Sequence, residues 1–269
     1  NSSSNGRKMT YKEFYIDDGV SLKVSVKEIL YSNKSEYQKI EVLDTDRFGV
    51  LLALDDAVQL CTQDYHNYHM AFISAARDKL RSGESALIIG GGDGVLARFL
   101  IDDGVTDITQ VELDPKVVSV SRRYLKSMHK DSFDEIKVEI GDGAEFVKNT
   151  DKKFDYVFCD ITDFCEGMED YQNSGKLFTH EFFSNLKKIM TDNSVFVCQT
   201  DLSFYDDKQR SSTLELLKHH FKMRGSYMTP VHSYGGLSSF VWASDTVNLG
   251  HQMMLGECNK YLETSVGGN

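Results

Sequence analysis

The sequence contains no apolar run that approaches the roughly 18 residues needed to span a membrane. Residues 1–8 read NSSSNGRK and lack the hydrophobic core of a signal peptide. These two absences exclude the usual membrane and secreted classes, and they predict a cytoplasmic protein without membrane contact. Residues 1–10 are expected to form a flexible leader.

Cysteine is sparse, and its spacing excludes two further classes. The chain has 5 cysteines, an odd number without a CxxC pair, which favours reduced thiols over a disulfide framework or a zinc site. His66 and His69 are three residues apart, but no carboxylate or cysteine accompanies them in a recognised ligand spacing. We therefore expect no bound metal ion.

Positive charge is in deficit. The chain has 30 Lys and Arg residues against 41 Asp and Glu residues, a formal net charge of −11. A nucleic-acid binder depends on a clustered basic surface, so this balance argues against nucleic acid as a partner and favours a cationic one. Apolar residues make up 41% of the 269 residues, enough for the core of one large domain with a small appendage.

The order of predicted elements divides the chain into two regions. Residues 11–63 hold stretches rich in β-formers at 20–29, 37–43, 48–54 and 58–62, which indicate a small antiparallel β-hairpin domain. A helical pattern follows from residue 64 to residue 79. Strand-like runs then alternate with helices through residue 249, which predicts an α/β domain with a mostly parallel sheet and helices on both faces.

The strand runs of this domain are short and apolar. They lie at 86–89, 107–112, 136–140, 156–159 and 195–198, and helices are expected at 94–103, 115–126, 143–149, 178–190 and 207–221. Two last runs, 227–231 and 240–244, suggest an antiparallel hairpin that closes the sheet edge. Residues 250–269 are interpreted as a tail, with a short helix expected at 251–262.

Ligands of such sheets bind outside the carboxyl ends of the strands. The first parallel strand runs into Gly90-Gly91-Gly92-Asp93-Gly94, a turn that lets the backbone approach a ligand and points a helix N-terminus at it. Glu112 ends the next strand about 20 residues later, where an acid would hold a ribose diol. Both an NAD enzyme and an S-adenosylmethionine-type enzyme meet these conditions.

Two features favour an adenosyl sulfonium over a dinucleotide. The glycine turn lacks the spaced GxGxxG pattern, and the third strand leads into Asp142, whose carboxylate can accept a hydrogen bond from an adenine amino group. Asp142 also suits the N-cap of a helix that starts at Gly143, and the two roles are compatible.

Carboxylates at the same edge indicate a substrate with ammonium groups. In a methyltransferase the turn at Asp93 lies beside the methionine carboxylate, which an aspartate would repel, whereas a decarboxylated donor suits it. Asp160 and Asp163 follow the fourth strand, three residues apart. As a cap and a turn residue they would carry no function, but the acidic net charge favours a site for ammonium groups. Decarboxylated S-adenosylmethionine reacting with a polyamine meets this description.

The combined motifs resemble those of the polyamine aminopropyltransferases, the spermidine synthase and spermine synthase family, over residues 11–249. Each motif alone is weak, whereas the set is highly specific. The motifs are Ser35-Glu36-Tyr37-Gln38, Asp64 to Tyr68-His69, Gly90-Gly91-Gly92-Asp93-Gly94, Val111-Glu112-Leu113-Asp114, Gly141-Asp142-Gly143, Asp160-Ile161-Thr162-Asp163, Leu177-Phe178 and Cys198-Gln199.

The resemblance implies a small N-terminal β-hairpin domain on a Rossmann-like domain of class I methyltransferase topology, usually in a homodimer. It implies no tightly bound cofactor, with decarboxylated S-adenosylmethionine as co-substrate and methylthioadenosine as product. The donor positions are Gln38, Gly90, Gly92, Asp93, Glu112, Asp142 and Ala144. The acceptor positions are Tyr68, His69, Asp160, Asp163, Gln199 and Tyr234. Among these, Asp160 is the candidate general base and Tyr68 its catalytic partner.

Departures from the family pattern concern the acceptor. Asp163 is followed by FCEGMED in place of the usual gatekeeping loop, and Gly236 stands where spermine synthases carry an acceptor-binding glutamate. Met70 replaces the glutamate of Tyr-His-Glu, and Val95 replaces a glycine. The acceptor thus stays open between putrescine and spermidine. A catalytically inactive paralogue that acts as a binding or regulatory subunit is the alternative, and a methyltransferase is a third reading.

A longer acceptor would need a second carboxylate for its distal ammonium group. The candidates are Glu166, Glu169, Asp170 and Asp201. An acidic loop exposed to water is the simpler interpretation of the first three.

Overall fold

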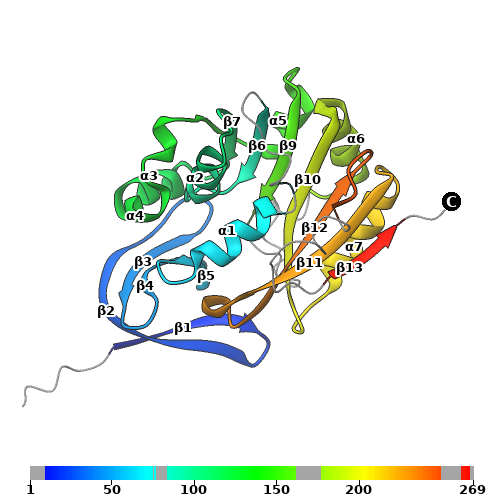
Figure 1. Ribbon diagram of the computed structural model, residues 1–269. Coiled ribbons are helices and arrows are strands. Elements are labelled where there is room, and N and C mark those ends of the chain that lie inside the picture. Colours follow the sequence, from blue (N-terminus) through cyan, green and yellow to red (C-terminus); the bar gives the residue numbers. More distant parts are fainter. Residues whose placement is uncertain (1–9, 75, 77–83, 162–176, 250–261, 267–269) are drawn as a thin grey trace, which may run out of the picture.

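The computed structural model of the chain describes residues 10–74, 76, 84–161, 177–249 and 262–266. It contains a five-stranded sheet built from the N-terminal part of the chain and an eight-stranded sheet built from the rest. Figure 1 shows the smaller sheet below the larger one, with helices on both faces of the larger sheet. This arrangement confirms the predicted α/β class with an N-terminal antiparallel domain.

The N-terminal sheet is antiparallel, and its strands lie in chain order. Phe14, Leu43 and Leu51 are almost fully buried in one cluster of this sheet. The first strand was not predicted as an element of its own, because its apolar side chains, at positions 11 and 14–16, do not alternate along the strand, and only Phe14 is buried. The strands are β1 (Thr10–Asp17), β2 (Val20–Lys34), β3 (Lys39–Thr45), β4 (Gly49–Leu54) and β5 (Ala57–Cys61).

The larger sheet is parallel in the middle and antiparallel at one side. Its order is β13-β11-β12-β10-β9-β6-β7-β8, and the strands from β10 to β8 run parallel. The predicted hairpin forms between β11 and β12, but it does not end the sheet, because β13 pairs with the outer side of β11. The strands are β6 (Ser85–Gly90), β7 (Asp107–Glu112), β8 (Lys137–Ile140), β9 (Phe154–Asp160), β10 (Met190–Ser203), β11 (Met223–Val231), β12 (Gly236–Ser244) and β13 (Leu262–Val266).

Strand β10 has parallel β9 on one side and antiparallel β12 on the other. Residues 194–201 of this strand are all buried. The helix expected at 251–262 lies outside the described residues, except that Leu262 begins β13.

The helices start and end close to where the sequence predicts them. Asp114 caps α3 by accepting the N–H of Lys116, with Pro115 in the first turn, and Thr179 caps α6 by accepting the N–H of Phe182. Beyond α1, residues 75 and 77–83 are not described. The helices are α1 (Tyr65–Ser74), α2 (Val95–Asp102), α3 (Pro115–Tyr124), α4 (Lys126–His129), α5 (Gly143–Asn149), α6 (His180–Ile189) and α7 (Lys208–Lys218), with short 3-10 turns η2 (Ser132–Asp134) and η4 (His232–Tyr234).

Two apolar layers hold the helices on the sheet. Phe72 of α1 and Leu96 of α2 pack against one face of the sheet, and Phe183 of α6 and Leu217 of α7 pack against the other. A third cluster joins the two sheets, because Val42 and Leu52 of the N-terminal sheet contact residues of α2, α3 and α4. Burial of these side chains fixes the position of the N-terminal sheet over the carboxyl ends of the parallel strands.

No helix in the described part of the chain is long and apolar enough to cross a membrane.

Candidate active site

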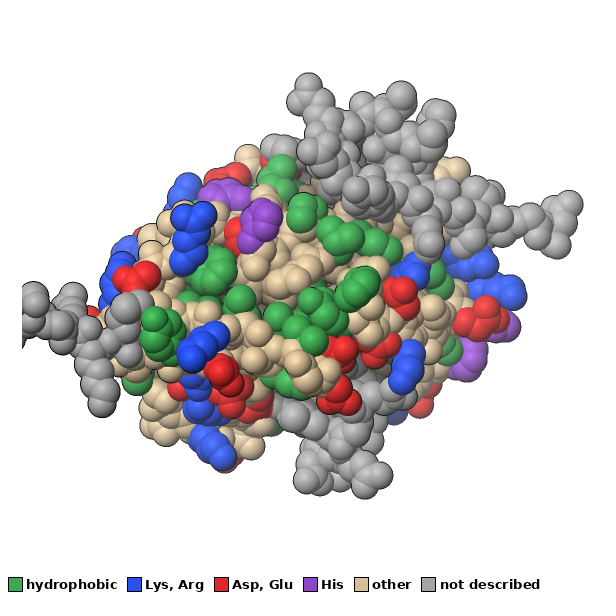
Figure 2. Space-filling model, turned by 90° about the horizontal axis from the view of Figure 1, so that it is seen from below, with side chains coloured by type: hydrophobic (Ala, Val, Ile, Leu, Met, Phe, Trp, Pro, Cys, Tyr) green, Lys and Arg blue, Asp and Glu red, His purple; other side chains and the backbone are tan. Residues whose placement is uncertain are grey.

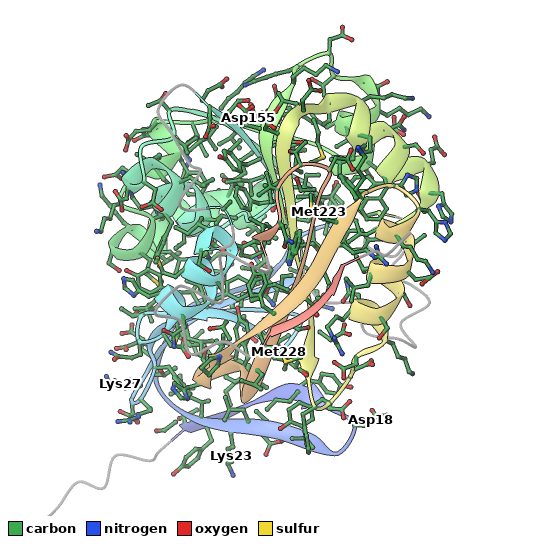
Figure 3. All side chains as sticks on the ribbon, turned by 45° about the vertical axis from the view of Figure 1, so that its right-hand side comes forward. Asp18, Lys23, Lys27, Asp155, Met223 and Met228 are labelled. Carbon is green, nitrogen blue, oxygen red and sulfur yellow. The ribbon has the colours of Figure 1, made fainter. Side chains whose placement is uncertain are left out.

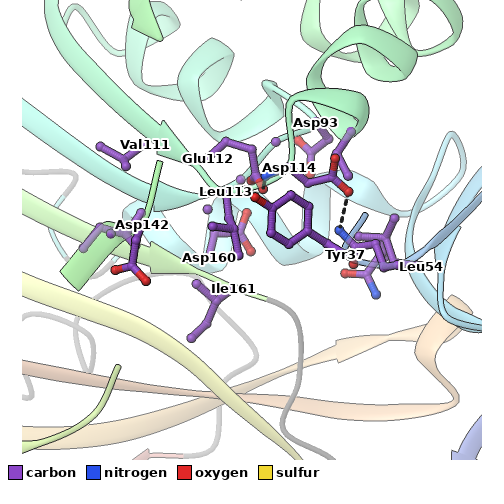
Figure 4. Close-up of a pocket in the computed structure, with 18 of the residues that line it drawn as sticks. Tyr37, Leu54, Asp93, Val111, Glu112, Leu113, Asp114, Asp142, Asp160 and Ile161 are labelled. Atoms are coloured by element: carbon purple, nitrogen blue, oxygen red, sulfur yellow. Dashed lines mark hydrogen bonds between the residues drawn. The ribbon is translucent and has the colours of Figure 1, made fainter. Parts of the chain in front are cut away.

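A cavity of about 300 Å³ opens at the carboxyl ends of β6, β7, β8 and β9, beneath the turn between β2 and β3. Figure 4 shows Asp93, Glu112, Asp142 and Asp160 placed around it. The cavity is lined by Glu36, Tyr37, Gln38, Leu52, Leu54, Gln59, Tyr68, Ile89, Gly90, Gly91, Gly92, Asp93, Val111, Glu112, Leu113, Asp114, Val117, Gly141, Asp142, Gly143, Asp160, Ile161 and Leu177.

The first glycines of the turn leave no room for side chains. Gly90 and Asp160 are register partners on β6 and β9, and a Cβ on Gly90 would stand 2.0 Å from the Asp160 carbonyl oxygen. A Cβ on Gly92 would stand 2.7 Å from a carboxylate oxygen of Glu112. A larger residue at position 90 would therefore clash with the backbone of β9, and one at position 92 would displace the Glu112 side chain.

Glu112 and Asp114 form one wall. The Asp114 N–H donates to Oε1 of Glu112 at 2.9 Å. Asp114 accepts hydrogen bonds from the Ser35 hydroxyl at 2.6 Å and from the Gln38 side-chain amide at 3.2 Å, the latter drawn in Figure 4. These contacts fasten the β2–β3 turn to the larger domain, so Gln38 and Tyr37 are held over the cavity.

Asp142 caps α5, as the sequence predicts. Its Oδ1 accepts the N–H of Ala144 at 2.7 Å and that of Glu145 at 3.1 Å. The side chain is exposed and lines the cavity as well, so capping and ligand contact are compatible. Ala144 lies in the first turn of α5, directly behind Asp142.

His69, Asp93 and Asp160 form a compact group. Each offers one ligand atom, and these atoms all lie within 4.8 Å of one another. This grouping suits a cation, either a metal ion or an ammonium group. Asp93 also accepts the N–H of Val95 at 2.7 Å, which fixes its carboxylate at the start of α2.

The protonation of His69 follows from its contacts. The imidazole is fully buried, and its Nδ1 lies 2.7 Å from the Tyr65 carbonyl oxygen, which can only accept, so Nδ1 carries the proton. Burial lowers the pKa of His69, while the Asp93 charge opposes this change. The neutral ring turns its Nε2 lone pair toward Asp93, 3.8 Å from Oδ1.

Aromatic side chains complete the opposite wall. The Tyr68 hydroxyl donates to Oδ1 of Asp160 at 2.6 Å. The ring of Tyr234 stands 5.5 Å from the Tyr68 ring in an edge-to-face contact, and its hydroxyl donates to the carbonyl of Gln59. The two rings come from α1 and η4, and the carbonyl comes from β5, so a helix, a turn of the larger sheet and a strand of the N-terminal sheet meet at this wall.

The charged side chains of the cavity are all acidic. Carboxylates line it, and no lysine or arginine does so in the part of the chain that the structure describes. Burial raises the pKa of Glu112 to about 7, and the nearby charges of Asp114 and Asp93 add to this rise while backbone hydrogen bonds oppose it. Such a site favours a ligand that brings positive charge.

The structure brings most of the predicted site residues together. Gln38, Tyr68, Gly90, Gly92, Asp93, Glu112, Asp142 and Asp160 line the cavity, and His69, Ala144 and Tyr234 lie directly behind its wall. Gln199 does not line the cavity. It is buried in β10, and its amide donates to the Thr200 carbonyl. Asp163 lies outside the described residues, as do Glu166, Glu169 and Asp170.

Asp201, a candidate partner for the distal ammonium group of a longer acceptor, is not part of this cavity lining. It is buried and accepts the backbone N–H of Arg210 at 3.1 Å. One of its contacts is therefore made inside the fold, to the first turn of α7.

Sequence reasoning missed Asp114, Tyr37 and Gln59 as lining residues. Asp114 and Tyr37 lie inside motifs that carry the family resemblance, beside the predicted donor residues Glu112 and Gln38, so the motifs could have indicated them. Gln59 gave none, because its place in the wall depends on a strand of the other sheet.

Comparisons with known proteins agree with this geometry. Residues 63–251 match a family model described as spermine/spermidine synthase domain, and residues 9–62 match one described as spermidine synthase tetramerisation domain. A polyamine aminopropyltransferase of Thermoplasma acidophilum is 41% identical over 193 residues, which cover 71% of this chain and 68% of the relative. One of Thermoplasma volcanium is 36% identical over 231 residues, covering 85% and 82%.

A solved structure is similar over nearly the whole chain. It is a crystal structure of spermidine synthase in complex with the transition state analogue AdoDATO, with a TM-score of 0.82 and 26% sequence identity. The alignment covers 98% of this chain and 90% of that one. The similarity therefore includes both sheets and the cavity between them.

Proposed function

The chain belongs to the spermine/spermidine synthase family, and from this premise we propose that it is a polyamine aminopropyltransferase. It moves the aminopropyl group of decarboxylated S-adenosylmethionine to a polyamine and releases methylthioadenosine. The observation that carries the proposal is the cavity itself, which is lined by carboxylates and, among the described residues, by no lysine or arginine. Both substrates of the reaction carry ammonium groups.

The donor occupies the side of the cavity next to the glycine turn. Glu112 accepts hydrogen bonds from the ribose hydroxyls, and Asp142 accepts one from the adenine amino group. Gln38, held by Asp114, covers the nucleoside from the N-terminal domain. Asp93 pairs with the donor's ammonium group. The neutral His69, which the sequence assigns to the acceptor, lies beside Asp93 and accepts a hydrogen bond from the same ammonium group through Nε2.

The acceptor enters beside Tyr68 and Asp160. An alkyl amine has a pKa near that of lysine, about 10.4, so it arrives protonated and must lose a proton before it can attack. Asp160 takes this proton, and Tyr68 orients the carboxylate. The amine nitrogen then forms a bond to the propyl carbon next to the sulfonium, the carbon–sulfur bond breaks, and its electron pair turns the sulfonium into a neutral thioether.

Positioning supplies most of the acceleration in this scheme. The sulfonium is already an activated leaving group, so no covalent intermediate with the protein is needed. Holding the amine in line with the carbon–sulfur bond contributes several orders of magnitude.

The test is a product assay with decarboxylated S-adenosylmethionine and either putrescine, spermidine or a longer diamine in separate reactions. Release of methylthioadenosine with one amine supports the proposal and identifies the acceptor. Donor binding without release with any amine contradicts it and favours an inactive paralogue. Tighter binding of S-adenosylmethionine than of its decarboxylated form favours a methyltransferase. Activity that persists in EDTA would indicate that His69, Asp93 and Asp160 bind an ammonium group and not a metal ion.

We further propose a homodimer formed through the N-terminal sheet. This sheet carries exposed aromatic and aliphatic side chains, among them Tyr11, Tyr15 and Ile29. Figure 2, which views the molecule from the side of this sheet, shows hydrophobic side chains interspersed with charged ones. Sedimentation velocity of the chain and of an Ile29→Lys variant tests the proposal. A monomeric wild type contradicts it.

A cytoplasmic location is also a proposal. Cys159 and Cys198 are register partners on β9 and β10, and both are buried. Thiols that lie so near each other stay reduced most readily in a reducing compartment.

A further inference from the structure

Asp64 lies next to the aromatic wall formed by Tyr68 and Tyr234, here called the acceptor wall. It joins three segments of the chain through buried hydrogen bonds, which we call the clamp. Only 6% of the Asp64 surface is exposed. Its Oδ1 accepts hydrogen bonds from the Ser233 hydroxyl at 2.9 Å and the Cys61 thiol at 3.0 Å, and its Oδ2 accepts the Ser233 N–H at 2.7 Å. One carboxylate therefore joins the end of β5, the start of α1 and the turn η4.

The clamp connects parts of the chain that are far apart in sequence. Asp64 and Ser233 are separated by 169 residues. Asp64 stands where the segment matched by the tetramerisation-domain model, 9–62, gives way to the segment matched by the synthase model, 63–251. A second contact runs parallel to it, because the Asn67 side-chain amide donates to the Pro230 carbonyl at 3.3 Å.

Both elements that the clamp joins carry an aromatic residue of the acceptor wall. Tyr68 lies one helical turn after Asp64 on α1, and Tyr234 directly follows Ser233 in η4. The two rings stand 5.5 Å apart, and the Tyr68 hydroxyl holds Asp160. If η4 moved away from the start of α1, this spacing would open and the wall beside Asp160 would lose its shape.

We propose that Asp64 is a positioning residue for the acceptor amine, acting through Tyr68 and Tyr234 without touching the substrate itself. The inference rests on the proposed function for the identity of the acceptor. It adds a residue whose effect falls on the amine and not on the donor, because no contact of Asp64 reaches Glu112, Asp93 or Asp142.

The chain offers a matched control in Asp155. Its Oδ2 accepts the N–H of Ser85 at 2.9 Å and the Ser85 hydroxyl at 3.2 Å, and its Oδ1 accepts the Thr191 hydroxyl at 2.7 Å. The set of bonds is thus nearly the same as at Asp64. Asp155 lies near the start of β9, whereas the cavity opens at the end of that strand. Figure 3 shows it at the end of the molecule away from Asp18 and Lys23 of the N-terminal sheet.

The experiment compares Asp64→Ala, Asp155→Ala and the wild-type chain. Putrescine and spermidine are titrated separately into each protein saturated with methylthioadenosine, and the KM for the amine is measured where there is turnover. We expect Asp64→Ala to raise the amine Kd and KM by between about tenfold and 10²-fold. The Kd of methylthioadenosine should stay within about twofold. Asp155→Ala should lower the melting temperature without changing the amine Kd.

A conservative variant separates positioning from loss of folding. In Asp64→Asn the amide oxygen can accept the Ser233 N–H while the amide group donates to the Ser233 hydroxyl, so the amine Kd should return to within about threefold of wild type. If Asp64→Ala does not fold, Ser233→Ala takes its place, because it removes the hydroxyl bond and keeps the N–H bond.

Three results would overturn the inference: an amine Kd in Asp64→Ala equal to that in Asp155→Ala, an equal loss for methylthioadenosine and amine, or a wild-type chain that binds no amine. A wild-type chain that binds the amine but transfers nothing counts against the proposed function alone. In that case the binding comparison still decides the role of Asp64.

Discussion

The phenol of Tyr68 donates a 2.6 Å hydrogen bond to Oδ1 of Asp160, across 92 residues of sequence. A contact of this length is typical of a hydroxyl that donates to an ionised carboxylate. It fixes the orientation of the Asp160 carboxylate at the end of β9, where the proposed reaction has the acceptor amine lose its proton.

Replacement of Asp160 by asparagine should separate chemistry from binding. Asparagine keeps the size of the side chain but cannot take up the proton of the amine. We expect kcat to fall by at least about 10²-fold, the usual contribution of a general base. The Kd of methylthioadenosine, measured by calorimetry, should stay within about twofold. Turnover near the wild-type rate would remove Asp160 from this role.

Replacement of Tyr68 by phenylalanine should have a smaller effect of the same kind. The variant keeps the ring contact with Tyr234 and loses the hydrogen bond to Asp160, so we expect kcat to fall by about tenfold. Tyr227→Phe is the control, because the Tyr227 hydroxyl donates to the Ala71 carbonyl at 2.6 Å within the core. Steady-state kinetics in which both variants lose activity equally would indicate a general loss of packing.

Asp93→Asn should discriminate between two ligands of the same pocket. The amide oxygen can still accept the Val95 N–H, so the turn keeps its shape. Decarboxylated S-adenosylmethionine has an ammonium group for Asp93 to pair with, whereas methylthioadenosine has none. The Kd of the donor should rise by about tenfold or more, as expected for a lost charged hydrogen bond. Equal losses for the two ligands would contradict the pairing.

Glu112→Gln should raise the stability of the fold at high pH and weaken ligand binding. The pKa of Glu112 is raised from 4.5 to about 7. Between these two pH values, Glu112 keeps its proton in the folded chain and has lost it in the unfolded chain. The contribution of Glu112 to stability therefore falls as the pH rises from about 4.5 to 7, and the full cost is present above this range. Glutamine does not carry this cost, so the variant should be more stable at pH 8.5 by up to roughly 3 kcal/mol, and unchanged at pH 4.5.

Thermal unfolding at the two pH values measures this difference, with exposed Glu28→Gln as a control that should shift neither value. The ionised form of Glu112 should also bind the ligand better, because an ionised carboxylate accepts hydrogen bonds from both ribose hydroxyls. Methylthioadenosine binding to the wild type should therefore weaken as the pH falls below about 7, and Glu112→Gln should bind weakly throughout. A Kd that does not depend on pH between 5 and 8 would argue against a ribose contact.

Much of the fold could be predicted where side chains next to each other decide the structure. Asp142 and Asp114 cap helices through their own next residues, so α5 and α3 begin where the sequence places them. The glycine turn and the acids that follow each strand likewise meet at one edge, because the carboxyl ends of parallel strands always do.

What could not be predicted depends on contacts between distant segments. Asp114 reads as a helix cap, yet it also holds Ser35 and Gln38, which lie 79 and 76 residues earlier. Asp201 is a candidate ligand from the sequence, and only the structure shows that it is buried and accepts the backbone N–H of Arg210. Strand β1 has no alternating apolar pattern, and only the structure shows that Phe14 is its one buried side chain. Each of these positions is determined by which surface packs against it, and no local pattern carries that information.

The place of β10 between β9 and β12 has a consequence for the chain as it leaves the ribosome. Strand β10 is synthesised before β12, and until β12 arrives its buried residues 194–201 present an open hydrogen-bonding edge. Such edges pair readily with other chains. A nascent chain that stalls between these two strands would thus be exposed to aggregation, and the closing hairpin protects the translation product as much as it shapes the enzyme.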